Sequence, residues 1–474
     1  MILKIIKNRC VWDAVLLRFA AVAASVVLGL LYVGCDSFVE VEMPAGHLAS
    51  PQIFEEAGTA DAAMTEVYAK MRDDGMLSGN PAGFSYTLGL YADELDFYAG
   101  SEQGGFGYYS NSLLAQSTGI SSLWNASYRQ IYGANAVIYG VTNSATLAQG
   151  DRDRLKGEAL FVRALLHSML SGAFGSVPYI ATTDYQQNRS AVKLPAADVL
   201  LRAKLDLEEA AVLLPEEYMV PDRTRPNRFA AEALLARLCL YLGEWEEASS
   251  HASAVIGASS MYGMDTDFAE AFRIGSAGTI FQFSPGFSGT NTLEAQTFTF
   301  VSGPPTSIAL SPGLLDAFEP GDLRRAQWVR EVAGGSGSWY HARKYRETAS
   351  AVTQTEFSKV LRLGETYLIR AEARARLGLV QAAGEDLNAV RHFAGLGDTP
   401  AASSEQLLLA VLQERRVELF TEFGHRFFDL KRYGQLDAVL GGSKPGWDAH
   451  DSLFPLPESE LLLNPNLNPQ NSGF

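Results

Sequence analysis

The feature that most constrains the fold is a pair of short helices predicted at Arg225–Ala258, RPNRFAAEALLARLCLYLGEWEEASSHASAVIGA. Apolar residues recur at helical spacing from Phe229 to Leu240. Pro226 suits a first helical turn, which has no use for the missing N–H. Gly243 predicts the end of the first helix, because glycine adopts the left-handed conformation without steric cost. The order of small residue, Leu-Gly, aromatic and small residue is the tetratricopeptide pattern.

The same pattern returns at Glu365–Arg391, ETYLIRAEARARLGLVQAAGEDLNAVR. Ala236 then aligns with Ala371 and Ala248 with Ala383, and the two Leu-Gly pairs also coincide. A single hairpin of this kind cannot bury both of its faces, so partner hairpins are needed. We expect a helical-repeat scaffold, and the alternative is two unrelated amphipathic hairpins.

Residues 1–34 have the pattern of a secretory signal, in which basic residues precede a short apolar core. The core, FAAVAASVVLGLLYVG, is slightly short for a membrane span. Val33-Gly34-Cys35 resembles a bacterial lipobox, with Tyr32 where leucine is usual, and this implies that Cys35 is lipidated. An uncleaved anchor helix is the alternative. The acidic residues that follow resemble a lipoprotein surface-export signal: Asp36, Glu40 and Glu42.

The chain is acidic, with a net charge of −16 that becomes −19 without residues 1–34. This charge argues against nucleic-acid binding and disfavours anionic ligands, so neutral ligands fit best. The three cysteines, Cys10, Cys35 and Cys239, cannot build a disulfide framework or a cysteine metal site. We expect Cys239 to be a buried, inert thiol. We predict no metal site and no cofactor, although the sequence leaves open whether a metal ion stabilises an acidic loop.

Composition divides the mature chain, 35–474, into regions of one domain. Helical repeats are expected mainly at 50–260 and 356–440, with a loop-dominated stretch at Gly75–Ser117 that is rich in glycine and proline. Residues 261–355 are rich in Gly, Ser and Thr, with alternations that suggest only short strands. Their aromatic residues argue against disorder, so we interpret this region as an ordered, ligand-facing insert. Residues 441–474 fit an extended C-terminal strap.

Several segments together resemble the SusD/RagB family of outer-membrane glycan-binding lipoproteins. The strongest is Glu414–Gly434, ERRVELFTEFGHRFFDLKRYG, in which Phe423 departs from the usual family pattern. The others, in the expected order, are Trp124–Ala136, Gly157–Pro178 and the closing Pro455–Phe474. Together they span nearly the whole mature chain.

The resemblance implies a mainly α-helical fold of about four tetratricopeptide-like hairpins, packed against an irregular, loop-rich half with a few short strands. It also implies a partner, a SusC-like TonB-dependent transporter on which the lipoprotein sits as a hinged lid. The implied location is the outer membrane, through a lipid anchor and facing the cell exterior. The implied action is capture of an oligomeric nutrient, with no chemistry on the ligand.

Aromatic residues are the main candidates for a sugar site, because flat C–H faces of sugars stack on rings while polar groups fix their orientation. Trp339-Tyr340 follows GGSGS and is expected at an exposed loop tip, with His341 and Arg343 as possible hydrogen-bonding neighbours. For any one ring, packing in the core is the alternative. The predicted ligand-binding residues are Trp339, Tyr340, Trp328, Tyr98, Phe97, Tyr108, Asp96 and Arg343.

The hypothesis that the protein is an enzyme has weaker support in the sequence. Asp93, Glu94 and Asp96 are the best carboxylates for glycoside hydrolysis, which needs two such groups across a sugar. The charged residues of Glu414–Gly434 are better explained as pairs between helices. No serine-hydrolase, zinc-protease or phosphate-loop motif occurs. We therefore predict no catalytic residue, and two alternatives stay open: an envelope scaffold for protein partners, and a surface glycosidase.

Overall fold

The hairpin that dominates the sequence is present in the computed structural model, which describes residues 51–474 except 288, 336 and 350–352. Its helices are α9 (Arg228–Leu242) and α10 (Trp245–Gly257). Gly243 ends α9 in the left-handed conformation, with φ +77°, as predicted. The start differs slightly, because Asn227 caps the helix by accepting the N–H of Ala230 at 3.0 Å. Pro226 therefore lies before the cap and not in the first turn.

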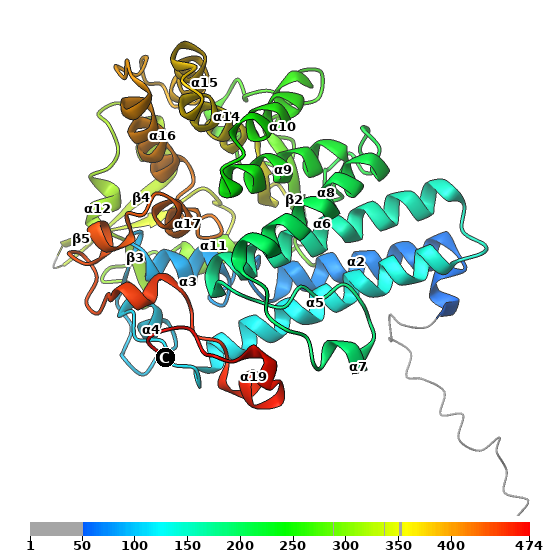
Figure 1. Cartoon of the computed structure of the whole chain (residues 1–474). Coiled ribbons are helices and arrows are strands. Elements are labelled where there is room, and N and C mark those ends of the chain that lie inside the picture. The colour runs from blue at the N-terminus through cyan, green and yellow to red at the C-terminus, as the bar shows by residue number, and fades with distance from the viewer. Residues whose placement is uncertain (1–50, 288, 336, 350–352) are drawn as a thin grey trace, which may run out of the picture. The chain divides into compact units, whose positions relative to one another are not determined.

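The second copy forms α14 (Leu363–Arg376) and α15 (Val380–Phe393), and α14 packs directly against α9 and α10 (Figure 1). The small residues that aligned between the copies are all fully buried: Ala236, Ala371, Ala248 and Ala383. Small side chains at these positions let the helices approach closely. The repeat interpretation of the two hairpins is confirmed.

The remaining long helices continue the stack on both sides. In chain order, α2, α5, α6 and α8 each pack on the next and lead to α9, while α16 packs on α14 and α15. Their bounds are α2 Ala57–Asp73, α5 Thr118–Asn143, α6 Gln149–Phe174, α8 Ala196–Leu213, α16 Ser404–Glu418 and α17 His425–Arg432. The predicted fold class, mainly α with tetratricopeptide-like hairpins beside an irregular half, is confirmed.

Short helices fill the irregular half and the connections. Two of them, α3 (Phe84–Tyr91) and α4 (Gly105–Tyr109), lie in the stretch that was expected to be loop, and every residue of α3 is buried. A helix that is buried on all sides carries no amphipathic stripe to detect. The others are α7 Tyr185–Asn188, α11 Leu293–Phe298, α12 Pro312–Leu315, α13 Leu323–Gln327, α18 Leu436–Leu440 and α19 Glu458–Leu463.

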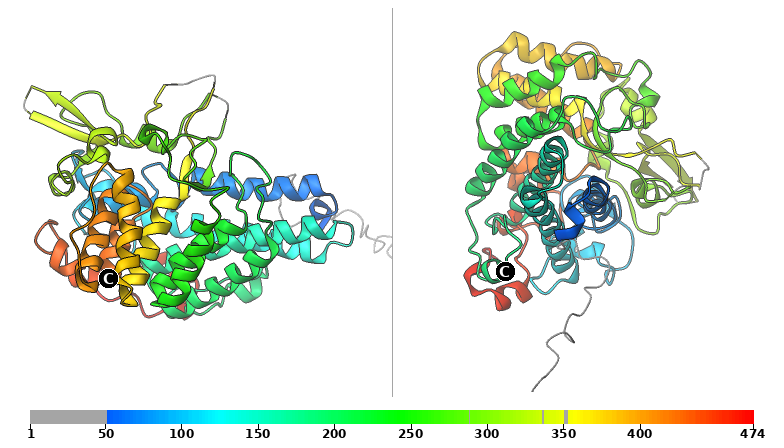
Figure 2. Two further views of the ribbon diagram at one scale, coloured as in Figure 1. Left: turned by 90° about the horizontal axis from the view of Figure 1, so that it is seen from above. Right: turned by 90° about the vertical axis from the view of Figure 1, so that its right-hand side faces the viewer.

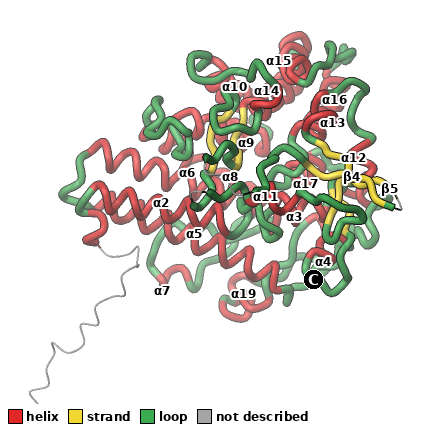
Figure 3. Tube along the Cα trace, turned by 180° about the vertical axis from the view of Figure 1, so that it is seen from behind, coloured by secondary structure: helices red, strands yellow, loops and turns green. Residues whose placement is uncertain are grey.

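The strands described form three two-stranded antiparallel sheets. The alternation of Phe281 and Phe283 lies in a strand as predicted, whereas Thr297 and Phe298, in the second alternation, end a helix. β1 (Leu95–Phe97) pairs with β3 (Ile308–Leu310), β2 (Thr279–Phe283) with β6 (Ser358–Arg362), and β4 (Val329–Gly334) with β5 (Gly337–Ala342). The β4–β5 hairpin stands out from the helices (Figure 2, left). From behind, its strands lie at one edge of the chain (Figure 3), where β4 contacts α13 and β5 contacts β3.

A buried ion-pair network joins the insert to the repeat helices. Arg324 of α13 is fully buried and contacts Glu414 and Glu418 of α16. Arg362, at the end of β6, binds Glu418 at 2.7 Å and Glu422 at 2.8 Å. The charged residues of the Glu414–Gly434 motif therefore pair within the structure, as predicted, and they hold the two halves together.

The C-terminal segment returns to the end of α6. The Phe454 N–H donates to the carbonyl of Ala173 at 2.8 Å, and the Asn471 amide donates to the carbonyl of Phe174 at the same distance. Residues Leu48–Phe474 form one compact unit. The predicted signal peptide and Cys35 lie outside the described residues, and the domain boundaries stay predictions. Within the part of the chain described, no helix has the length and apolar character needed to cross a membrane.

Candidate ligand-binding site

The site begins where the first loop region meets the insert. β1 and β3 pair with Asp96 opposite Ala309, and the pairing continues as the Tyr98 N–H donates to the carbonyl of Ser307 at 2.7 Å. β5 lies beside β3. This arrangement brings Tyr98 and Trp339, far apart in the sequence, close enough that the indole acts to lower the pKa of the Tyr98 phenol.

Trp339 packs against two glycines, Gly303 and Gly334, whose lack of a side chain leaves room for the indole. A Cβ built on Gly303 would lie only 2.1 Å from Cε3 of the indole, and one on Gly334 would lie 2.9 Å from Cζ3. The indole therefore packs against both glycines, and it stays half-buried, with part of its surface facing solvent. The indole can therefore occupy this position only because residues 303 and 334 are both glycine.

A carboxylate and a lysine accompany the rings. Burial raises the pKa of Asp96, while the charge of Lys444 acts in the opposite direction. The Lys444 ammonium lies 4.1 Å from the ring centre of Tyr109 and donates to the carbonyl of Leu90 at 2.6 Å. Burial, followed by the charge of Asp96, raises the pKa of Tyr109, so these groups share one electrostatic environment.

We call this set of residues the aromatic platform: Asp96, Phe97, Tyr98, Tyr109 and Trp339. Phe97 packs between Phe106 and Tyr109, with 6.3 Å between ring centres in each case. Tyr98 is 43% exposed, and its pKa is raised by burial and by Asp96. Exposed ring surface beside a carboxylate and phenol groups can stack on a sugar and accept or donate hydrogen bonds.

Tyr340 does not join the platform. It follows Trp339 on β5 and therefore points to the opposite face of the hairpin. The Arg325 guanidinium covers its ring, with Cζ 4.7 Å from the ring centre. Arg343 lies beyond the end of β5 and is half-buried; its backbone N–H donates to the carbonyl of Trp328 at 2.7 Å.

Two predicted site residues belong to the core instead, and this is a correction. Trp328 is 1% exposed and stacks on Phe268 at 4.7 Å between ring centres. Tyr108 is 6% exposed and packs against Phe454 of the C-terminal segment. Neither ring can stack on a ligand from this position. Each of these two rings packs against a ring from a segment that is distant in the sequence. Residue spacing alone does not predict such contacts.

The carboxylates suspected of catalysis are separated by their surroundings. Asp93 is bound by Arg416 at 2.8 Å and by Arg426 at 2.7 Å; burial alone would raise its pKa, but the two arginines hold it below the ordinary value. Glu94 is buried, and burial together with the charge of Asp93 raises its pKa to about 8. Only Asp96 of the three lies on the platform.

Sequence reasoning missed several groups that shape the site. Gly303 lies in a stretch of short turns, and Ser307 and Lys444 come from segments with no pattern that indicates ligand binding. Lys444 reaches the platform because the C-terminal segment folds back over α3 and α4. Among the described residues, the one group that could ligate a metal, Cys239, Glu247 and His251, shares no residue with the platform.

Two family models and several known proteins are similar to this chain. The model described as SusD family matches residues 330–474, and the model described as "Starch-binding associating with outer membrane" matches residues 106–240. SusD-like protein P2 of Formosa agariphila is 27% identical across 95% of this chain and 98% of that protein. SusD-like protein P25 of the same organism is 22% identical across 93% and 96%.

Solved structures share the fold. A SusD superfamily protein from Bacteroides vulgatus superimposes with a TM-score of 0.78, at 20% identity, covering 89% of this chain and all of that one. A laminarin-binding SusD-like protein gives 0.73 at 23% identity, covering 88% and 99%. A SusD-like carbohydrate-binding protein from Bacteroides fragilis gives 0.75 at 20% identity, covering 88% and 100%.

Proposed function

We propose, from the premise that this chain belongs to the SusD/RagB family, that it is a cell-surface lipoprotein that binds a glycan as a nutrient. The single observation that carries the proposal is the aromatic platform, where Tyr98 and Trp339 meet with part of their ring surface exposed. A neutral oligosaccharide suits this site better than an anionic ligand, because Asp96 contributes the nearest carboxylate and the chain is strongly acidic.

The proposal includes a partner and an anchor. A SusC-like TonB-dependent transporter would receive the glycan, with this protein as its lid, and Cys35 would carry the lipid that holds it at the outer membrane, facing the cell exterior. The description of one matching family model, as associating with the outer membrane, supports the proposed location, and the transporter partner rests on the family resemblance.

Binding without catalysis is the function that the surroundings of the acidic residues support. Glycoside hydrolysis needs two carboxyl groups that flank the same bond. Asp93 is paired with two arginines and Glu94 is buried, so Asp96 has no second carboxylate of the suspected triplet available to a ligand beside it. The scaffold alternative leaves the platform without a role, because a repeat scaffold binds its partners through its helical groove.

Calorimetric titration tests the proposal. Residues 48–474, the compact unit, would be titrated with neutral and acidic oligosaccharides that include laminari-oligosaccharides and malto-oligosaccharides. Saturable heat with intact ligand is the expected result. Shortened oligosaccharides in the product analysis would overturn the non-catalytic reading, and absence of heat for every sugar would overturn glycan binding.

Variants locate the site. Trp339→Ala is expected to weaken binding by about 2- to 10-fold, since an aromatic contact contributes about 0.5–1.5 kcal/mol. Tyr98→Phe retains the ring and isolates its hydroxyl. Tyr139→Ala is the matched control, because that ring is also exposed but lies on α5. Equal loss in the Trp339 and Tyr139 variants would refute the platform as the ligand site.

A further inference from the structure

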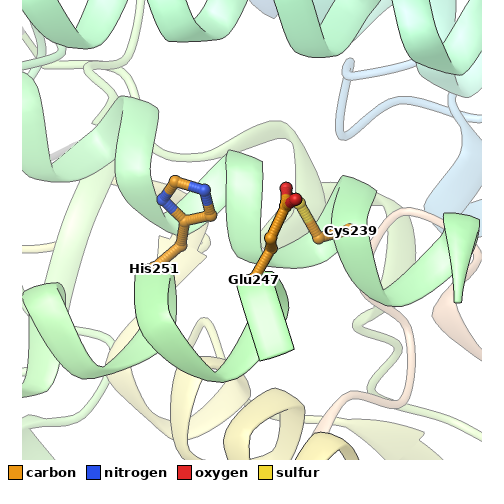
Figure 4. Close-up of side chains that lie close together, drawn as sticks. All are labelled: Cys239, Glu247 and His251. Atoms are coloured by element: carbon orange, nitrogen blue, oxygen red, sulfur yellow. The ribbon is translucent and has the colours of Figure 1, made fainter. Parts of the chain in front are cut away.

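Three side chains of the α9–α10 hairpin converge on one point at its surface (Figure 4). Glu247 and His251 lie one turn apart on α10, and Cys239 faces them from α9. One possible ligand atom from each lies within 4.8 Å of the other two. Cys239 is buried, His251 is half-buried and Glu247 is exposed, so the cluster has a protein side and an open side.

The imidazole of His251 is already oriented. Its Nδ1 lies 2.6 Å from a carboxylate oxygen of Glu232, one of the residues of α9. Figure 4 shows one ring nitrogen turned away from Glu247 and the other turned towards it. A histidine that ligates a metal commonly has its second nitrogen fixed by a carboxylate in this way, which sets the tautomer and leaves the other lone pair free.

We propose that Cys239, Glu247 and His251 bind a divalent cation of the zinc class, with Glu232 as the positioning residue of His251. Thiolate, imidazole and carboxylate are together the ligands that zinc takes, at about 2.0–2.3 Å. Three protein ligands leave a fourth, open position on the exposed side. The bound ion would tie the two helices of one repeat together.

A lysine side chain lies beside the cluster of Cys239, Glu247 and His251. The Lys204 ammonium, from α8, lies 2.7 Å from Glu244 and also binds Glu247. The carboxylates of Glu232, Glu244 and Glu247 outnumber the facing cations, Lys204 and the more distant Arg228, whose Nε lies 3.9 Å from Glu232. The cluster therefore retains an excess of negative charge that favours a second cation.

Metal binding exchanges one contact for another. Lys204 stays paired with Glu244, while Glu247 turns from the lysine to the cation. The Cys239 thiol loses its proton to solvent as the metal–sulfur bond forms, so affinity rises with pH. The proposal therefore predicts the direction of one effect: removal of the Lys204 charge must strengthen metal binding. If the cluster were only a structural ion-pair network, removal of this charge would only remove a contact.

Cobalt(II) is the probe, because a thiolate ligand gives it a charge-transfer absorption in the near ultraviolet. Residues 48–474 would be titrated with Co²⁺ and then with competing Zn²⁺. We expect the absorption to appear, Zn²⁺ to abolish it, and Cys239→Ala to lack it. Glu232→Gln is expected to weaken affinity about 10-fold, as for other groups that orient a metal-ligating histidine. Lys204→Met is expected to strengthen it at least about 3-fold.

Matched controls separate a site from surface binding. Glu246→Gln removes a neighbouring exposed carboxylate of α10 and should leave Co²⁺ affinity unchanged. Zn²⁺ should raise the melting temperature of the unaltered unit but not of Cys239→Ala, by linkage of binding to folding. No thiolate absorption, or an affinity that Lys204→Met leaves unchanged or weakens, would overturn the proposal. If Lys204→Met does not fold, the comparison of Cys239→Ala with Glu246→Gln decides.

Discussion

The guanidinium of Arg324 lies 2.6 Å from the carboxylate of Glu414, and both side chains are buried. Arg324 belongs to α13 in the insert, and Glu414 begins the motif on α16. Arg324 also binds Asp322 at 2.8 Å and Glu418 at 3.1 Å, so it is the cation at the centre of three carboxylates. The insert that supports Trp339 is thereby fixed to the repeat helices.

Arg324→Leu is expected to lower the free energy of unfolding by about 3–5 kcal/mol, because three buried carboxylates lose the cation between them, although Arg362 still binds Glu418. Urea unfolding of residues 48–474 measures the change. Arg325→Leu is the control: this neighbour is only half-buried and covers Tyr340, and its loss should cost about 1 kcal/mol or less. Equal effects of the two variants would show that the network adds little stability.

The two tryptophans of the insert should respond in opposite ways. Trp328→Ala is expected to destabilise the protein by about 3–5 kcal/mol, since it empties a core site between Phe268 and Phe272. Trp339→Ala should leave the melting temperature nearly unchanged and weaken ligand binding. Thermal unfolding beside calorimetric titration separates them, and a lost unfolding transition in Trp339→Ala would contradict its place in the site.

Gly303→Ala should act on the platform without touching the ligand directly. Its Cβ would occupy the space that the Trp339 indole now fills, so the indole must move. We expect ligand affinity to fall by an amount similar to that for Trp339→Ala. Gly335→Ala, where a Cβ meets no atom within 4 Å, is the matched control. Unchanged affinity in Gly303→Ala would mean that the position of the indole does not matter to binding.

Glu94 predicts a pH dependence of stability. Burial and the charge of Asp93 raise its pKa from 4.5 to about 8, so the folded protein holds a proton that the unfolded chain releases between these values. Stability from this group is present below pH 4.5 and is lost as the pH rises towards 8. Glu94→Gln should therefore match the unaltered protein near pH 4.5 and exceed its unfolding free energy by about 1 kcal/mol or more at pH 8.5. Urea unfolding at both values measures this, and a constant difference would contradict the shifted pKa.

Part of the candidate site was within reach of the sequence. Asp96, Phe97, Tyr98 and Trp339 were selected for residue type and loop position, and the structure brings them together. The same criteria also selected Trp328 and Tyr108, which are buried. Residue type shows that a ring can stack, but it cannot show whether the partner is a sugar or another side chain.

The sequence by itself determined the repeat helices, because helical spacing, the Leu-Gly turn and small residues at fixed positions are local or periodic properties. It also determined that the motif charges pair within the fold. Only the tertiary structure decided which rings remain exposed. That outcome depends on contacts between distant segments: Gly303 against Trp339, Phe268 on Trp328, and Lys444 over Tyr109. Such contacts have no fixed spacing along the chain. Because they arise from packing between distant segments, they leave no recognisable pattern in the amino-acid sequence.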